Sequence, residues 1–265
     1  MPSAPRRPSS RPRRPDRKGH TPAIEQEYAH RSHAALERGQ RLLKAEKIIR
    51  LVETVRPWEG ARVLDIGTGA GVIAATIAKK AGADGEVDSL DIGDERVETE
   101  GYRFQQVTDP RLPFSDKTFD IILSNHVIEH VGDTPEQNLH VAEIHRVLKD
   151  DGLLYLATAT RWLVMEPHYH LPFLSWFPRP LAGVYLRVTR RGRDYDCYLP
   201  SHRRLRHLLA DSGFRWKEPV FEAMRLMAEI EQPTGMTKRI LTAPEPVLKA
   251  IRPAIPTIIF LARKA

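Results

Sequence analysis

The chain has 265 residues, of which 41% are hydrophobic and 28% charged, enough for one large domain with a buried core. Its one cysteine, Cys197, excludes a disulfide framework and a zinc site built from several cysteines. The formal charge is +7, but residues 1–20 hold seven basic side chains and one acid, so the remainder is close to neutral. The net charge therefore gives little reason to expect a nucleic-acid partner.

Residues 1–22 are rich in proline and arginine and contain few apolar side chains. This composition predicts a disordered basic tail, which could contact an anionic surface. The N-terminus lacks the apolar stretch of a signal peptide, and no uninterrupted apolar run is long enough to span a bilayer. We therefore expect a cytoplasmic protein.

The hydrophobic pattern alternates between strands and helices along most of the chain. Strands are predicted at residues 62–66, 86–92, 104–107, 119–124 and 153–158. Helices are predicted at residues 42–55, 72–81, 134–152 and 202–212, the last capped by Ser201. This alternation predicts an α/β fold with a doubly wound parallel sheet.

The second half of the chain gives a clear helix start at Thr134 but less regular signals after residue 160. Thr134 is a predicted N-cap, with Pro135 at the first helical position and Gln137 completing a capping box. Residues 161–200 interrupt the alternation and are rich in proline, aromatic residues and arginine. The last strands are predicted at residues 216–220 and 257–262, and the segment between them has no clear pattern.

The strongest local signal is a glycine-rich turn that follows the first strand. Gly67, Gly69 and Gly71 lie between this strand and a helix, and Asp65 lies at the strand end. A dinucleotide site uses the spacing G-x-G-x-x-G, which is not the spacing here. A carboxylate at Asp65 would repel a pyrophosphate but would favour a ligand that carries an ammonium group.

Two more acids follow the next two strands. Asp91 ends the second strand, where a carboxylate can accept hydrogen bonds from both hydroxyls of a ribose. Asp109 follows the third, where it could bind an adenine amino group or simply form an Asp-Pro turn. The carboxyl ends of parallel strands meet at one edge, which predicts a shared site for Asp65, Asp91 and Asp109.

Four blocks in this order resemble the class I S-adenosylmethionine-dependent methyltransferases, in the small-molecule group often called type 11. The blocks are residues 65–71, residues 112–114 with 119–122, Glu129-His130-Val131, and residues 143–149 ending at Gly152. The resemblance implies a Rossmann-like sheet of seven strands in a methyltransferase domain at residues 23–265, with a substrate-side insertion at 161–200. It also implies S-adenosylmethionine as the cofactor.

The resemblance assigns cofactor contacts to individual residues. The backbone at Gly67, Thr68, Gly69 and Gly71 would pass under the methionine part, and Asp65 would face its amino group. Asp91 would hold the ribose and Asp109 the adenine edge, and Ile92, next to Asp91, would also contact the cofactor. Asn125 would lie along the methionine moiety beneath the transferable methyl.

Methyl transfer to oxygen is helped by a base that removes the acceptor's proton. His126 and His130 follow the fourth strand and are the candidate catalytic residues, with His126 favoured because it follows Asn125 directly. His168 and His170 open the insertion and are weaker candidates.

Two metal-binding patterns compete with this interpretation. Residues 126–130 also match H-x-x-E-H, the signature of inverted zinc proteases, which needs both imidazoles on one helix. The motif follows an apolar strand and precedes Gly132, so a helix is not expected there. His168 and His170 could likewise hold a metal, but we expect no metal.

The composition of the insertion at residues 161–200 indicates which class of acceptor to expect. Its aromatic residues and prolines would form a stiff apolar wall or simply cover a sheet edge. Residues 179–215 contain nine arginines and three acids, which indicates a solvated face, a phosphate-bearing acceptor or a phospholipid surface. We expect a small-molecule or lipid-linked acceptor and a peripheral contact with an anionic membrane.

Together these features predict a cytoplasmic methyltransferase that methylates its acceptor at oxygen. The alternatives are a catalytically silent module that retains the cofactor pocket, and an RNA-directed methyltransferase that uses the basic tail and the arginine-rich segment.

Overall fold

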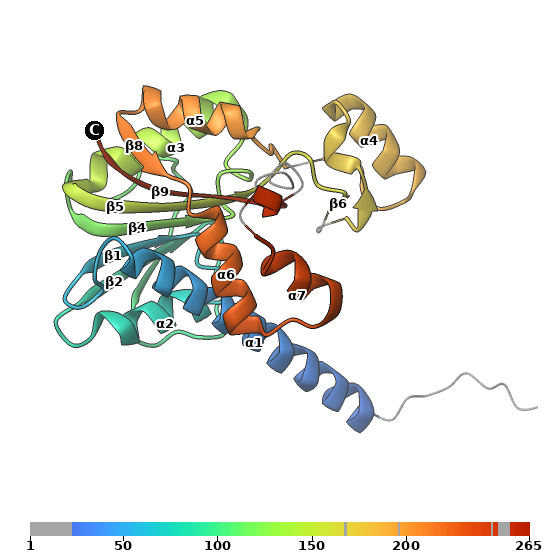
Figure 1. The fold of residues 1–265 in the computed structure, drawn as a ribbon, viewed down its shortest axis with the longest axis horizontal. Coiled ribbons are helices and arrows are strands. Elements are labelled where there is room, and N and C mark those ends of the chain that lie inside the picture. Colours follow the sequence, from blue (N-terminus) through green and yellow to red (C-terminus); the bar gives the residue numbers. More distant parts are fainter. Residues whose placement is uncertain (1–22, 167–168, 196, 245, 249–254) are drawn as a thin grey trace, which may run out of the picture. The chain divides into compact units, whose positions relative to one another are not determined.

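The computed structural model describes residues 23–265 except 167, 168, 196, 245 and 249–254 (Figure 1). The predicted tail therefore lies outside the described residues. Residues up to Arg38 form a unit of their own, in which the described residues are helical, and residues 39–265 form the larger unit. The helix α1, Ala23–Glu53, belongs to both units.

The larger unit is built on a sheet of seven strands in the order β3-β2-β1-β4-β5-β9-β8, which confirms the predicted Rossmann-like architecture. The strands are β1 Arg62–Ile66, β2 Glu86–Asp91, β3 Arg103–Gln106, β4 Phe119–Asn125, β5 Leu148–Ala159, β8 Phe214–Lys217 and β9 Thr257–Lys264. Strands β1 to β5 pair in parallel, and β9 pairs antiparallel with both β5 and β8. The order reverses at β1, so the carboxyl ends of β1 and β4 border the crevice where such sheets bind ligands.

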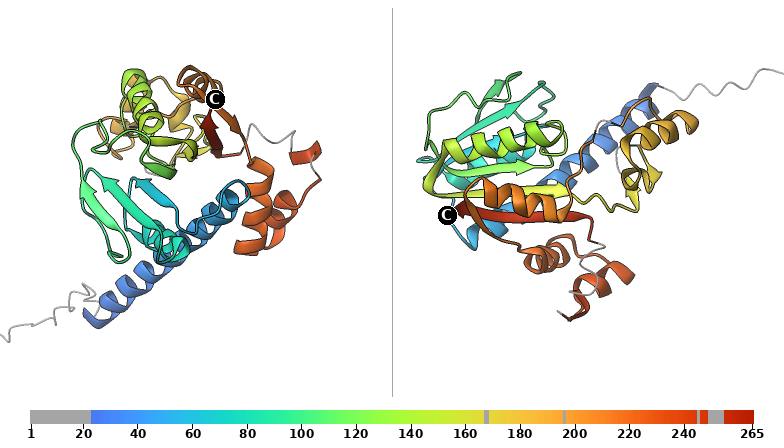
Figure 2. Two further views of the ribbon diagram at one scale, coloured as in Figure 1. Left: turned by 90° about the vertical axis from the view of Figure 1, so that its left-hand side faces the viewer. Right: turned by 90° about the horizontal axis from the view of Figure 1, so that it is seen from above.

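Helices cover both faces of the sheet (Figures 1 and 2). The helices of the sheet layers are α2 Val72–Ala81, α3 Thr134–Val147, α5 His202–Asp211 and α6 Val220–Glu231. On one face, α3 and α5 pack on strand residues such as Leu64 and Ile122. On the other, residues 48–52 of α1 pack with α2 on Val63 and Ile121. Adjacent residues of one strand thus enter opposite cores, which explains why the parallel strands are apolar throughout.

The helix α3 differs from its prediction at both ends. Its N-cap is Asp133, not Thr134, and the side chain of Gln137 donates hydrogen bonds to the carbonyls of Ile128 and Tyr198, so the capping box predicted between Thr134 and Gln137 does not form. The helix ends at Val147, and β5 begins at the next residue. Gly152 is therefore not the helix end but lies in β5, where the pairing register with β4 shifts.

The strand predicted at 216–220 also has different bounds in the structure, where β8 spans Phe214–Lys217. Strand β8 ends at Lys217, and Pro219 precedes the helix α6, because proline has no N–H with which to continue a ladder. Much of the segment without a clear pattern is helical: α6 is followed by α7, Gly235–Leu241. The Ser201 cap is confirmed, since its hydroxyl accepts a hydrogen bond from Arg204 N at 3.2 Å.

The residues between β5 and α5 form a small structure with an apolar cluster of its own. It contains the hairpin of β6, Met165–Glu166, and β7, Leu171–Pro172, then the short helix η1, Leu174–Trp176, and α4, Arg179–Val188. Among the described residues, no helix is both long and apolar enough to cross a membrane.

Candidate functional site

The glycine turn lies at the carboxyl end of β1, and all three of its glycines have positive φ angles. A Cβ on Gly67 would overlap the side chain of Val127, and one on Gly71 would overlap the carbonyl of Glu98. Only glycine satisfies both the backbone angle and the close approach at these two positions. The first contact also places the turn directly against the loop that follows β4.

Asp91 fixes the turn to the end of β2. Its Oδ2 accepts a hydrogen bond from Gly69 N at 2.8 Å, and its Oδ1 accepts one from Ile92 N at 2.7 Å. The structure thus brings Gly69 and Asp91 together as predicted from the strand ends. Each carboxylate oxygen can accept a further hydrogen bond, so the group remains competent to bind a hydroxyl.

Asp65 is buried at the end of β1, with 2% of its surface exposed. Burial raises the pKa of its carboxyl to about 7; the hydrogen bond from Ser89 opposes the shift and the charge of Asp91 adds to it. Ser89 Oγ lies 3.3 Å from Asp65 Oδ2 and 2.6 Å from Thr68 Oγ1. A cationic ligand group beside Asp65 would stabilise the carboxylate and return its pKa toward the ordinary range.

The remaining predicted cofactor residues differ in their surroundings. Ile92, the neighbour of Asp91, is 80% exposed. Asp109 is exposed, and its carboxylate accepts a hydrogen bond from Arg111 N at 2.7 Å, so it forms the turn that its sequence context also allowed. Asn125 is half-buried at the last position of β4.

His126 has a partner that the sequence did not reveal. Its Nδ1 lies 3.0 Å from Oε1 of the buried Glu129, whose Oε2 accepts a hydrogen bond from Thr158 Oγ1 at 2.8 Å. Burial acts to raise the pKa of Glu129, but the hydrogen bonds from His126 and Thr158 and the attraction of His126 outweigh it and lower the pKa. Glu129 is therefore a charged group that orients the His126 ring.

The backbone at His126 is unusual. Its φ of 59° places a non-glycine residue in the left-handed region, a conformation found disproportionately at functional sites. The residues from His126 to His130 form a bend and a turn, not the helix that the inverted zinc-protease motif requires. Within the described residues, no cluster of three or more metal-ligating side chains is found.

The other candidate histidines lie elsewhere. His130 is exposed, with Nδ1 4.0 Å from Cys197 Sγ. His170 is an exposed residue of the insertion with a φ of 52°, and His168 falls outside the described residues. His126, by contrast, has a ring nitrogen within hydrogen-bonding distance of a buried carboxylate.

An apolar cavity of about 540 Å³ adjoins the end of β4. It is lined by Lys44, Lys47, Ile48, Leu51, Asn125, His126, Tyr155, Val220, Ala223, Met224, Met227, Ile240, Leu241, Ile255, Pro256, Thr257 and Ile259. The sequence did not predict this cavity because many of its lining residues come from residues 221–256, the segment without a clear pattern. Asn125 and His126 are the predicted site residues that reach it.

The model of a methyltransferase-domain family matches residues 30–218 of the chain. The chain belongs to this methyltransferase family. Together with the fold, the match confirms the predicted class I S-adenosylmethionine-dependent methyltransferase and its cofactor.

Several relatives of this methyltransferase have curated names. It is 30% identical to the ubiquinone biosynthesis O-methyltransferase of Rhizobium etli, in a match that covers 52% of this chain and 65% of the relative. The protein of the same name from Rhizobium rhizogenes is 32% identical, with the same coverage. A ubiquinone/menaquinone biosynthesis C-methyltransferase of Geotalea uraniireducens is 27% identical over 62% of this chain and 74% of the relative.

The chain thus spans just under two thirds of the length of the two O-methyltransferases. Among solved structures, the magnesium protoporphyrin IX methyltransferase of Synechocystis matches 85% of this chain and 84% of its own, with 14% identity and a TM-score of 0.50. This likeness supports the fold of the methyltransferase.

The raised pKa of Asp65 predicts a pH-dependent cost in stability. The folded state holds the Asp65 proton up to about pH 7, whereas the unfolded chain releases it near its ordinary value of 3.8, so stability falls as the pH rises between the two. The substitution Asp65→Asn removes this titrating group. As the pH rises from 4 to 7.5, the free energy of unfolding of the variant should therefore increase by about 2–4 kcal/mol relative to that of the wild type.

Urea unfolding of both proteins at several pH values measures this difference. Asp84→Asn, at an exposed carboxylate, is the matched control. If the difference in free energy of unfolding between Asp65→Asn and the wild type does not change with pH, the pKa of Asp65 is not raised.

Proposed function

We propose that this methyltransferase transfers a methyl group to a hydroxyl of an apolar small-molecule or lipid-linked acceptor held in the 540 Å³ cavity. The observation that carries the proposal is the contact between the two halves of the site. Gly67 of the glycine turn lies against Val127, and the preceding residues Asn125 and His126 line the apolar cavity. Cofactor and acceptor would thus meet at the end of β4.

We infer that the predicted cofactor residues bind an adenosyl sulfonium, a role that their chemistry supports. In this proposal Asp91 binds the ribose hydroxyls, and the exposed side chain of Ile92 covers one face of the adenine. Asp65 balances the ammonium group of the methionine part. The turn from Gly67 to Gly71 lets the ligand approach the backbone closely, with Thr68 and Asn125 beside it. Asp109 would bind the adenine edge from its exposed turn.

Asp91→Ala should weaken the binding of S-adenosylmethionine by about 1.5–3 kcal/mol, because it removes charge-assisted hydrogen bonds. Isothermal titration calorimetry measures the change. Glu95→Ala, at an exposed acid four residues away, is the control and should bind as the wild type does. An unaltered dissociation constant in Asp91→Ala would remove the ribose assignment.

S-adenosylmethionine supplies an electrophilic methyl group on a sulfonium leaving group. The protein must hold the acceptor oxygen in line and remove its proton. We propose that His126 takes this proton. Its Nδ1 faces Glu129, which leaves Nε2 for the acceptor, and the charged Glu129 stabilises the imidazolium that forms. Thr158 keeps Glu129 in place through its hydrogen bond.

His126→Ala should lower kcat by about 10²–10⁴-fold without weakening cofactor binding, as expected for a lost general base. In Glu129→Gln the imidazolium that forms on His126 loses its negatively charged neighbour, so kcat should fall as well. His207→Ala, at an exposed histidine of α5, is the control. A His126→Ala enzyme with full activity would rule out this role.

The relatives support oxygen as the acceptor atom but differ among themselves. Two are named O-methyltransferases and one a C-methyltransferase of quinone biosynthesis. A base beside the methyl favours oxygen, because a hydroxyl becomes a better nucleophile when it loses its proton. Incubation with labelled methyl donor and phenolic quinone precursors tests both the acceptor class and the alternative of a catalytically silent module.

The insertion supports a peripheral membrane contact. Nine large apolar side chains of this segment are exposed: Trp162, Val164, Met165, Phe173, Trp176, Phe177, Leu181, Val184 and Val188. Arg187, Arg190, Arg191 and Arg193 are exposed in the same segment. Apolar and basic side chains presented together suit an anionic lipid surface, where a lipid-linked acceptor would reside.

The double substitution Leu181→Ser and Val184→Ser should reduce binding to vesicles of phosphatidylcholine and phosphatidylglycerol in a flotation assay, since it removes apolar area from the proposed contact. Val247→Ser, at an exposed apolar residue outside the insertion, is the control. If the wild type floats equally with neutral and anionic vesicles, or with neither, the proposed anionic membrane contact is wrong.

A further inference from the structure

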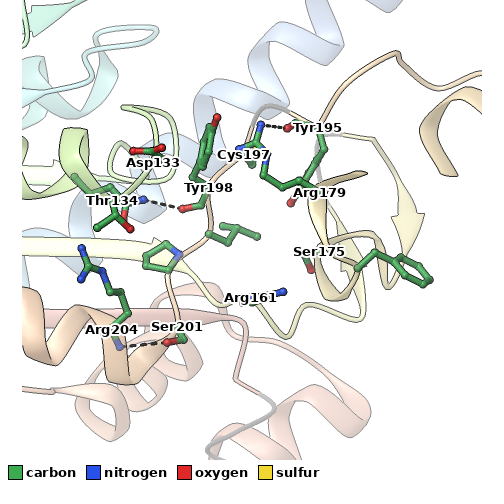
Figure 3. Close-up of a pocket in the computed structure, with 14 residues that line it drawn as sticks. Asp133, Thr134, Arg161, Ser175, Arg179, Tyr195, Cys197, Tyr198, Ser201 and Arg204 are labelled. Carbon is green, nitrogen blue, oxygen red and sulfur yellow. Dashed lines mark hydrogen bonds between the residues drawn. The ribbon is translucent and has the colours of Figure 1, made fainter. Parts of the chain in front are cut away.

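A second pocket, of about 310 Å³, lies where the insertion meets the first turns of α3 and α5 (Figure 3). It is lined by Asp133, Thr134, Gln137, Arg161, Ser175, Phe177, Arg179, Tyr195, Cys197, Tyr198, Leu199, Pro200, Ser201 and Arg204. None of these residues lines the apolar cavity or belongs to the predicted cofactor set. Its volume is at the lower end of the range for ligand pockets, about 300–1,000 Å³.

The pocket is basic. Arg161, Arg179 and Arg204 line it from three separate segments, and among the described residues of the lining Asp133 is the one carboxylate. Asp133 interacts electrostatically with Arg179 and offsets part of its charge. The described lining residues thus carry two more positive than negative charges, in a hollow that a small anion can enter.

Two of the arginines are held in position. Arg179 donates a hydrogen bond to the carbonyl of Tyr195 at 2.6 Å, and its guanidinium lies 3.4 Å from the centre of the Tyr198 ring. Arg204 donates to Asn138 Oδ1 at 2.8 Å. Such contacts reduce the conformational entropy that an arginine loses on binding an anion. Arg161 is exposed and makes no hydrogen bond or ion pair among the described contacts.

Polar atoms in the lining lack partners within the described part of the chain. Ser175 is 4% exposed, and its buried Oγ has no hydrogen-bond partner. The Nε of Arg204 is also buried without a partner. Buried donors are normally satisfied because leaving one unpaired is unfavourable, so these two indicate an acceptor that belongs in the pocket.

Two helices begin at the pocket. The first residue of α3, Thr134, and the N-cap of α5, Ser201, are both in the lining. The positive ends of the two helix dipoles therefore add to the charge of the arginines. A tetrahedral oxyanion suits this setting, because arginine donates paired hydrogen bonds to phosphate and helix N-termini favour negative charge.

We propose that this pocket is a phosphate-binding site, separate from the methyl-transfer centre, that uses Arg161, Arg179, Arg204 and the hydroxyl of Ser175. The phosphate could come from a soluble phosphate-bearing molecule or from a phospholipid headgroup presented beside the exposed apolar side chains of the insertion. Both sources share the same chemistry in the pocket. The site requires neither the cofactor nor the proposed acceptor.

The test uses the full chain and inorganic phosphate, with chloride added to keep the ionic strength constant. Phosphate should raise the melting temperature of the wild type and bind measurably by calorimetry. Arg161→Gln and Ser175→Ala should each weaken phosphate binding by about tenfold or more, as expected for a lost hydrogen bond to a charged group. Arg225→Gln, which removes the same charge from an exposed arginine of α6 outside the pocket and outside the insertion, should bind phosphate normally.

Ser175→Ala also separates a binding role from a structural one. Without phosphate, this variant should melt at or above the wild-type temperature, because a buried hydroxyl without a partner is removed. A lower melting temperature together with unaltered phosphate binding would show that Ser175 serves the fold and would overturn its assignment to the site.

A second arm distinguishes the two sources of phosphate. If inorganic phosphate has no effect but vesicles containing phosphatidylglycerol bind in a manner that depends on Arg161 and Ser175, the ligand is a headgroup. If neither binds, or if Arg225→Gln loses as much affinity as Arg161→Gln, the pocket is not a phosphate site. S-adenosylmethionine binding, measured in parallel, should be the same in all variants, so a failure of the cofactor assignment would be recognised separately.

Discussion

The absence of side chains at Gly67 and Gly71 determines how closely the loops at the carboxyl edge of the sheet approach one another. Gly67 lies against Val127, and Gly71 lies against the backbone of Glu98. Asp91 then holds the turn through Gly69 N. The loops after β1, β2 and β4 are thereby packed into one unit, and the backbone of His126 adopts a left-handed conformation beside it. The proposed cofactor site and the proposed acceptor cavity can share an edge because these loops are in contact.

The first half of the fold could be predicted because its signals are local. Apolar strands, a glycine turn and helical periodicity each act over a few residues, and β1, α2 and β4 were found almost at their true bounds. The errors at the two ends of α3 arose because distant parts of the chain interact with the residues that carried the local signals. Gln137 bonds to the carbonyls of Ile128 and Tyr198, distant parts of the chain that a capping-box motif cannot anticipate. Gly152 resembled a helix end because a glycine in an irregular strand pairing carries the same local signature.

The site was predictable to the extent that it follows strand ends. Asp65 and Asp91 are placed by the termini of β1 and β2, so the topology alone brings them to one edge. Glu129 was visible only as part of a motif, since its role depends on burial and on contacts with His126 and Thr158. The basic pocket joins side chains from the insertion to two helix starts, and no spacing in the chain reveals that arrangement.

The place of β9 in the sheet has a consequence for synthesis on the ribosome. Residues 257–264 lie between β5 and β8, so β8 has its neighbour only after the 47 residues from 218 to 264 have also been translated. Until then the nascent β5 presents an open edge of apolar residues, including Leu154 and Leu156, that can pair with another polypeptide. The pairings of β9 with β5 and β8 are therefore the last of the sheet to form. A chaperone that covers the open edge of β5 would act before these pairings form.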